Sequence, residues 1–226
     1  MKIAGVDEAG KGPVIGSMFV AGVMIDETSL RRLGNMGVKD SKAISPKRRE
    51  LLAIRLRKMC DYCVHEITAA QIDELRRIIT MNEIVMKAHA HVLRNLKPDC
   101  AYIDASDVDA SRFAESVTRE SGGINVVAEH KADKTRPIVS AASIIAKVSR
   151  DKWIKELEEK VGQNIGSGYP SDPTTIKFLR GWVSEYGQLP NFTRNSWKTA
   201  QDILKGVEKS DNSDIKPNDE NSDDFR

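Results

Sequence analysis

The chain has 226 residues, of which 40% are hydrophobic and 30% are charged, and its formal net charge is +2. That composition is typical of one globular domain with a small appendage. No apolar run is long enough to cross a bilayer and no secretory leader is recognisable, so we expect a cytoplasmic protein with no membrane partner. The last 18 residues hold six acidic and three basic side chains, which leaves a mildly basic body compatible with a nucleic-acid partner.

Short runs rich in Val, Ile and Ala predict five strands, at residues 2–7, 17–25, 63–67, 101–104 and 125–129. Helical spacing and helix-start signals predict helices that begin near residues 46, 84, 110, 140, 173 and 196. Because strands come first and helices accumulate later, we expect an α/β core followed by a small helical C-terminal subdomain. The predicted boundaries are 1–165 for the core, 166–209 for the subdomain and 210–226 for a disordered acidic tail.

Carboxylates stand at the ends of three predicted strands. Asp7 and Glu8 end the first strand in "VDEAGKGPVIG", Asp104 ends "AYID", and Asp133 follows the fifth strand in "EHKADKTRP". Side chains alternate along a regular strand, so we expect the turn at Gly10–Gly12 to bend the chain and bring Asp7 and Glu8 around one edge of the sheet. The carboxyl ends of strands in an α/β sheet are where sites are built.

Several carboxylates close together repel one another unless a cation neutralises them. Oxygen ligands without histidine or cysteine indicate Mg²⁺ or Mn²⁺, and two such ions about 4 Å apart suit in-line phosphoryl transfer. The alternative for Asp104 and Asp133 is a turn or capping role, which single acidic residues commonly have.

A polar stripe runs along the long helix predicted from residue 140. The other positions of this helix are apolar almost all round, which predicts burial. The stripe is therefore either a solvated face or a face turned toward the carboxylates. Its members are Ser140, Ser143, Lys147, Arg150 and Asp151.

Five segments in order resemble the signature segments of the ribonuclease HII family, archaeal type: "VDEAGKGPVIG", "VKDSK", "YIDASD", "HKAD…PIVSAASIIAKVSRD" and "GSGYPSDP". The resemblance spans about residues 2–198. It implies an RNase H-like fold, with a five-stranded mixed sheet flanked by helices. It also implies an endoribonuclease that cleaves the RNA strand of RNA–DNA hybrids and single ribonucleotides embedded in duplex DNA, leaving 5′-phosphate and 3′-hydroxyl ends.

The resemblance also implies roles for particular residues. The family's metal-binding carboxylates correspond to Asp7, Glu8, Asp104 and Asp133. Its G-R-G loop, which contacts the backbone around the ribonucleotide, corresponds to Gly10, Lys11 and Gly12. Lys11 stands where arginine is commoner, and lysine lacks the planar fork of arginine.

A tyrosine that packs under the following deoxyribose corresponds to Tyr169; the alternative for this residue is a core aromatic. Lys39 and Lys42 are either contacts to the nucleic-acid backbone or ordinary surface lysines. We also count Ser140, Ser143 and Lys147 as candidates for substrate binding.

Two other classes of protein compete with this interpretation. Gly5 and Gly10-Lys11 match the start of a P-loop, but Gly12 replaces the hydroxyl residue that would bind Mg²⁺. A non-catalytic nucleic-acid-binding module would explain the basic body but has no use for four converging acids. Gln201 begins a pattern like that of a sliding-clamp peptide, but Val207 and Glu208 stand where that peptide has two aromatic residues, so we do not expect clamp binding. We also expect a monomer.

Overall fold

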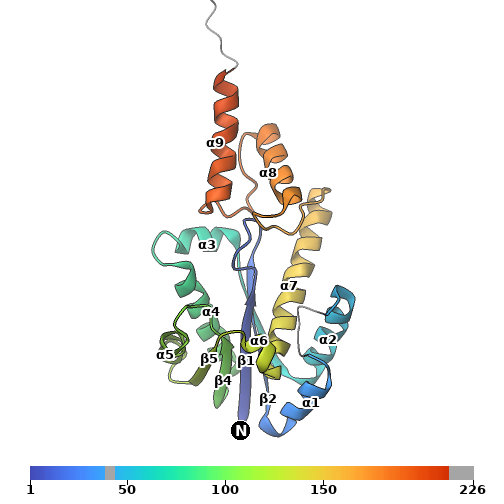
Figure 1. Cartoon of the computed structure of the whole chain (residues 1–226), viewed down its shortest axis with the longest axis vertical. Coiled ribbons are helices and arrows are strands. Elements are labelled where there is room, and N and C mark those ends of the chain that lie inside the picture. Colours follow the sequence, from blue (N-terminus) through green and yellow to red (C-terminus); the bar gives the residue numbers. More distant parts are fainter. Residues whose placement is uncertain (39–43, 214–226) are drawn as a thin grey trace, which may run out of the picture.

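The structure is a computed structural model that describes residues 1–38 and 44–213. Helices flank a central sheet, and two further helices lie beyond one end of it (Figure 1). The strands are β1 (Lys2–Ala9), β2 (Met18–Asp26), β3 (Asp61–Ile67), β4 (Cys100–Asp104) and β5 (Asn125–Glu129). The helices are η1 (Glu27–Ser29), α1 (Leu30–Asn35), α2 (Pro46–Met59), α3 (Ala69–Leu75), α4 (Met81–Leu96), α5 (Ala110–Glu120), α6 (Ala132–Thr135), α7 (Pro137–Val161), α8 (Pro173–Tyr186) and α9 (Lys198–Ser213).

The sheet has five strands in the order β3-β2-β1-β4-β5, which confirms the predicted mixed sheet. β2 pairs antiparallel with both β1 and β3, whereas β4 pairs parallel with β1 and with β5. The parallel pairs need crossover connections, which α4 and α5 provide. The carboxyl ends of β1, β4 and β5 therefore meet at one edge of the sheet.

β1 stays regular to its last residue, Ala9, with Asp7 opposite Ala21 and Glu8 opposite Val20. The expectation that the chain bends here was wrong, although both carboxylates lie at the edge of the sheet where β1 ends. The unbroken ladder with β2 keeps the alternation of a strand, so Asp7 and Glu8 point to opposite faces of the sheet.

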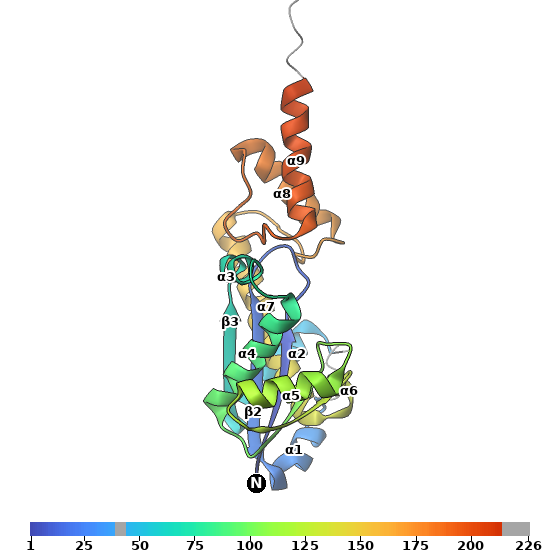
Figure 2. The same ribbon diagram turned by 90° about the vertical axis from the view of Figure 1, so that its left-hand side faces the viewer.

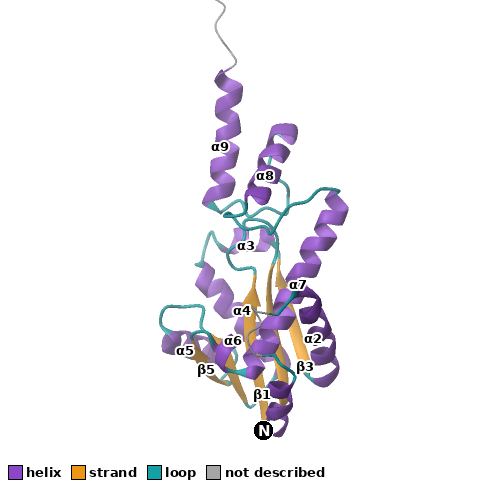
Figure 3. Cartoon of the chain, turned by 45° about the vertical axis from the view of Figure 1, so that its right-hand side comes forward, coloured by secondary structure: helices purple, strands orange, loops and turns teal. Residues whose placement is uncertain are grey.

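Each face of the sheet has its own hydrophobic core. Ala4 and Val6 of β1 pack with α4 and α5 on one face, while Ala21 and Val23 of β2 pack with α2 and α7 on the other. Figures 2 and 3 show these helices on either side of the strands. Gly5 lets α7 approach β1 closely, because a Cβ at this position would lie 2.4 Å from the carbonyl carbon of Ile138.

α8 and α9 share a third hydrophobic core, which includes Val14 and Ile15 from the loop after β1. That loop therefore connects the sheet, through β1, with the C-terminal helices α8 and α9. α9 extends to Ser213, past the position where the tail was predicted to begin, and the rest of the tail lies outside the described residues. The domain boundaries stay predictions. Within the described part of the chain, no helix is both long enough and apolar enough for a bilayer crossing.

Candidate active site

Asp7 and Asp104 lie on the face of the sheet that α7 covers. Val6 is opposite Ile103 in the parallel register, so the next residues along, Asp7 and Asp104, occupy equivalent positions on neighbouring strands. The backbone amide of Glu8 donates to Asp7 Oδ1 at 2.8 Å, and Ser143 of α7 forms a hydrogen bond with the same carboxylate. The amide of Ala132, the first residue of α6, donates to Asp104 Oδ1 at 2.8 Å.

Glu8 lies on the other face, where α4 packs. His89 Nε2 is 3.1 Å from Glu8 Oε2, and Ser106 Oγ donates to Glu8 Oε1 at 3.2 Å. The Lys11 ammonium joins this group from the loop after β1, donating to Ser106 Oγ at 2.6 Å and to Asn82 Oδ1 at 2.8 Å. Lys11 is thus hydrogen-bonded to α4 and to the segment after β4, the same two parts of the chain that bind Glu8.

The fourth carboxylate, Asp133, is buried in the short helix α6 directly after Ala132. Burial raises the pKa of Asp104, and the charges of Asp133 and Glu8 add to that rise. Burial and the charges of Glu8 and Asp104 raise the pKa of Asp7 well above its ordinary value. The pKa of Glu8 is lowered instead, because its hydrogen bond with His89 and the Lys11 charge outweigh the effect of burial. The cluster therefore carries negative charge that the described residues only partly balance.

These carboxylates fit a hard divalent cation. Their oxygens are the donors that Mg²⁺ and Mn²⁺ favour. Burial first, and neighbouring carboxylates second, raise the pKa values of Asp7 and Asp104, and a bound cation would offset both effects. Among residues 1–38 and 44–213, no three acidic, histidine or cysteine side chains already form a cage around one point. Such a cage is not required, because Mg²⁺ is usually bound by one or two carboxylates together with water and substrate phosphates.

The loop at Gly10–Gly12 is held by its carbonyl groups. Arg194 is fully buried and donates to three carbonyl oxygens, those of Gly10 at 2.6 Å, Lys11 at 2.9 Å and Gly16 at 2.8 Å. Trp197 Nε1 donates to the carbonyl of Gly12 at 3.1 Å. A trans peptide unit directs its C=O and N–H in opposite directions. The amides of Lys11 and Gly12 therefore point away from Arg194.

A pocket of about 410 Å³ opens beside this loop, between Glu8 and α7. The Arg150 guanidinium lies 5.1 Å from the centre of the Tyr169 ring and donates to the carbonyl of Ser167. Lys147 donates to Ser143 Oγ at 2.7 Å, so it reaches Asp7 through one hydroxyl. The lining is largely basic and aromatic, and of the four carboxylates it includes Glu8. It consists of Glu8, Ala9, Gly10, Lys11, Gly12, Arg49, Lys147, Arg150, Asp151 and Tyr169.

The polar stripe of α7 divides into two parts. Ser143 and Lys147 face the carboxylates, but the buried hydroxyl of Ser140 donates to the carbonyl of Val38. We therefore withdraw Ser140 as a substrate-binding candidate. Ser140 lies near the N-terminus of α7, where the helix contacts Val38, so the spacing along the stripe does not place it at the site. Lys39 and Lys42 lie outside the described residues.

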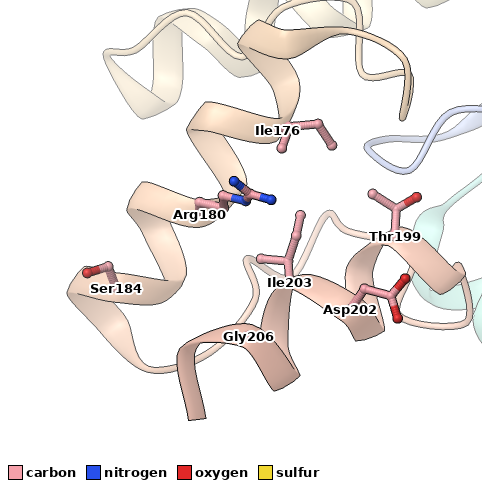
Figure 4. A pocket seen from close by; sticks show the side chains of 7 residues that line it. All are labelled: Ile176, Arg180, Ser184, Thr199, Asp202, Ile203 and Gly206. Carbon is pink, nitrogen blue, oxygen red and sulfur yellow. The ribbon is translucent and has the colours of Figure 1, made fainter. Parts of the chain in front are cut away.

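Sequence reasoning missed His89, Ser106 and Arg194. Nothing in the local sequence signals His89 and Arg194, because only the fold brings them to the site, whereas Ser106 lies two residues after Asp104 in the segment "YIDASD" and could have been found there. A larger cavity of about 710 Å³ lies between α8 and α9, where Figure 4 shows side chains from both helices. It contains none of the predicted site residues. Its lining is Ile176, Arg180, Ser184, Thr199, Asp202, Ile203 and Gly206.

Strand-end carboxylates beside a basic pocket, on a five-stranded mixed sheet, define a class of metal-dependent hydrolase that acts on nucleic acid. The comparisons with known proteins agree. The family model described as Ribonuclease HII matches residues 4–200. A ribonuclease HII of Methanothrix thermoacetophila is 53% identical over 203 residues, covering 89% of this chain and 96% of the relative.

Two solved structures are also similar. The ribonuclease H2 from Pyrococcus horikoshii OT3 has a TM-score of 0.88 and 45% identity, covering 92% of this chain and all of that one. The RNase HII in a PCNA complex from Archaeoglobus fulgidus has a TM-score of 0.82 and 45% identity, covering 88% of this chain and 96% of that one.

This chain belongs to the ribonuclease HII family. It is a metal-dependent endoribonuclease that acts on RNA–DNA hybrids. The RNase H-like fold is confirmed as well. Family membership rules out the P-loop NTPase and the non-catalytic binding module as interpretations of the sequence.

Proposed function

We propose that the four carboxylates Asp7, Glu8, Asp104 and Asp133 hold Mg²⁺ or Mn²⁺ and that the enzyme cleaves at single ribonucleotides in duplex DNA as well as in hybrids. When bound in pairs, such ions polarise the phosphate and supply a nucleophilic water for in-line hydrolysis. The expected products carry 5′-phosphate and 3′-hydroxyl ends. The observation that carries the proposal is the meeting of crowded, oxygen-only donors with a basic pocket at one sheet edge.

The chain's own groups orient the substrate. The amides of Lys11 and Gly12 point away from Arg194, toward the side where a phosphate and sugar would lie. Gly12 has no Cβ to keep the substrate backbone away. The side chain of Tyr169 stands next to Gly12, since a Cβ there would be 3.6 Å from Tyr169 Cε1. Loop and tyrosine together frame a space in which a 2′-hydroxyl distinguishes RNA from DNA.

Positive side chains on α2 and α7 complete this frame. Arg49 pairs with Asp151 at 2.9 Å, and Arg150 stacks on Tyr169. These cations balance phosphate charge near the carboxylates, a role that does not depend on base sequence. Lys39 and Lys42 keep their predicted role as backbone contacts.

The test is a labelled duplex DNA that contains one ribonucleotide, incubated with and without Mg²⁺. Cleavage at the ribonucleotide, only with metal and only in the wild type, supports the proposal. The Asp104→Asn variant is the control, since it keeps the size of the side chain and removes its charge. Equal cleavage by Asp104→Asn at saturating metal contradicts the assignment of the carboxylates. Cleavage of hybrid but not of the single-ribonucleotide duplex contradicts the substrate assignment alone.

The relative from Archaeoglobus fulgidus is in a complex with PCNA, but we do not extend that partner to this chain. Gln201 and Leu204 begin a clamp-like peptide within α9, and Val207 and Glu208 stand where aromatic residues are needed. The monomeric state and the cytoplasmic location stay predictions.

A further inference from the structure

His89 is a fully buried histidine on α4 that no motif of the sequence singles out. Its ring lies edge-on to Phe113 of α5, with centroids 5.6 Å apart. A histidine on an apolar helix face is more often a core residue than a functional one. Burying an imidazole carries a desolvation cost, however, and that cost calls for a compensating polar contact.

The polar contact of His89 is the carboxylate of Glu8, at 3.1 Å from Nε2. The other ring nitrogen, Nδ1, is buried and has no hydrogen-bond partner among the described residues. A ring with its proton on Nε2 donates to Glu8 and leaves Nδ1 as a bare acceptor, which avoids burying an unpaired N–H group. The geometry thus assigns the donor: His89 donates and Glu8 accepts.

Glu8 needs such a donor more than its neighbour does. Asp7 has a short side chain that the amide of Glu8 and the hydroxyl of Ser143 hold directly. Glu8 has an additional rotatable bond and lies on the opposite face of the sheet. Without His89, Ser106 would be the one remaining hydrogen-bond donor to the Glu8 side chain among the residues that the structure describes.

We propose that His89 is a positioning residue for metal binding: it holds the Glu8 carboxylate so that lone pairs on both oxygens stay available to a divalent cation. His89 occupies one lone pair on Oε2 and Ser106 occupies one on Oε1. An ionised carboxylate has about four lone-pair sites, so each oxygen keeps one for the metal. Partners that orient metal ligands in this way commonly change metal affinity by 10- to 100-fold when they are removed. This inference rests on the proposed metal-binding role of Glu8.

The test measures Mn²⁺ binding to the full chain by calorimetric titration without substrate, together with the melting temperature. His89→Phe keeps an aromatic ring against Phe113 but removes the hydrogen-bond donor. His89→Leu also removes the donor, and its smaller side chain covers the case in which Phe overpacks the site. His89→Gln keeps an N–H donor. We expect the Kd for Mn²⁺ to rise roughly 10-fold or more in a folded Phe or Leu variant and to recover in large part in the Gln variant.

The matched control is His91→Phe, on the same helix. His91 turns toward His65 of β3, with ring centroids 4.2 Å apart, whereas His89 contacts Glu8. We expect an unchanged Kd in this variant. A folded His89→Phe or His89→Leu protein with the wild-type Kd would overturn the proposal, as would a Gln variant that binds no better than these.

Glu8→Gln separates the two levels of inference. If this substitution weakens Mn²⁺ binding and the donor-free His89 variants do not, the proposed metal site stands and the role of His89 is wrong. If Glu8→Gln leaves Mn²⁺ binding unchanged, Glu8 is not a ligand, and both the proposed role of Glu8 and that of His89 are overturned.

Discussion

The guanidinium of Arg194 donates to the carbonyl of Gly10 at 2.6 Å, and this contact joins the loop after β1 to the segment before α9. The same side chain also binds the carbonyls of Lys11 and Gly16. A planar group with five donors can serve several carbonyls at fixed angles, which explains why an arginine is buried here. Burial and the nearby charge of Arg150 lower the pKa of Arg194 to about 9, so it keeps its charge at neutral pH.

Replacing Arg194 should disturb both stability and substrate binding. Arg194→Met leaves three carbonyls without their donor, two of them buried and one part-buried, at about 1–3 kcal/mol for each buried group. Arg194→Lys keeps the charge but not the fork, and we expect it to raise KM more than it lowers kcat. Steady-state cleavage and melting temperature check this, with the exposed Arg180→Met as control. A wild-type KM and melting temperature in Arg194→Lys would show that the planar guanidinium with its several donors is not required.

Asp7→Asn should stop cleavage and stabilise the metal-free fold. A carboxylate that binds catalytic metal contributes several kcal/mol in the transition state, so we expect a rate loss of roughly a hundredfold or more. Because the pKa of Asp7 is raised in the folded state, ionisation of Asp7 costs stability as the pH rises above the ordinary carboxyl value, and the whole cost is present above the raised pKa. A neutral Asn removes this cost, so the variant should melt higher than wild type at neutral pH in chelator.

The stability difference for Asp7→Asn should disappear as the pH falls, because Asp7 itself then takes up a proton and loses its charge. Thermal unfolding across the acid range provides the measurement. A lower melting temperature for Asp7→Asn at neutral pH would mean that the Asp7 carboxylate stabilises the metal-free fold.

Tyr169→Ala should impair substrate recognition without unfolding the protein. The side chain is 39% exposed and packs on Arg150, so the core alternative for this residue does not describe it. A core aromatic would cost about 3–5 kcal/mol on truncation, and we expect much less here. Cleavage of the single-ribonucleotide duplex should fall far more than the melting temperature. Full activity in the folded variant would remove Tyr169 from recognition.

Gly10 and Gly12 should respond differently to alanine. Gly10 has a φ of +90°, and a Cβ there would lie 2.9 Å from the carbonyl oxygen of Ser17, so Gly10→Ala should lower the melting temperature. At Gly12 a Cβ would meet Tyr169 at 3.6 Å, an ordinary contact. Gly12→Ala should therefore keep the stability and lose cleavage, because the methyl group meets the substrate. Equal stability losses in the two variants would contradict this division.

Asp172 should support the Tyr169 loop only when it is ionised. It accepts hydrogen bonds from the amide and hydroxyl of Ser167 and from the amide of Thr174, and these contacts lower its pKa to about 2. A lowered carboxylate pKa means stabilisation that is present above the ordinary value and lost as the pH falls toward about 2. The melting-temperature difference between wild type and Asp172→Ala should therefore be constant from neutral pH to about 4 and then shrink. A difference that persists unchanged near pH 2 would show that charge is not its cause.

The sequence alone predicted the five strands and the main helices, which the structure confirms, and it supplied the proposal that four carboxylates form the site. Strand periodicity places Asp7, Asp104 and Asp133 after buried apolar runs, and the co-ordered segments of the family point to the same residues. These signals are local, since they depend on neighbouring residues and their spacing.

Tertiary structure decided how the carboxylates are held. The ladder between β1 and β2 keeps Asp7 and Glu8 on opposite faces, which the glycines behind them do not reveal. His89 and Arg194 reach the site from 81 and 184 residues away along the chain. Contacts over such distances depend on how helices pack on the sheet, and the hydrogen-bond partner of a buried polar group has no signature in its own segment. Ser140 shows the converse. Its position in a polar stripe predicted a role in substrate binding, but in the folded chain its hydroxyl donates to the carbonyl of Val38.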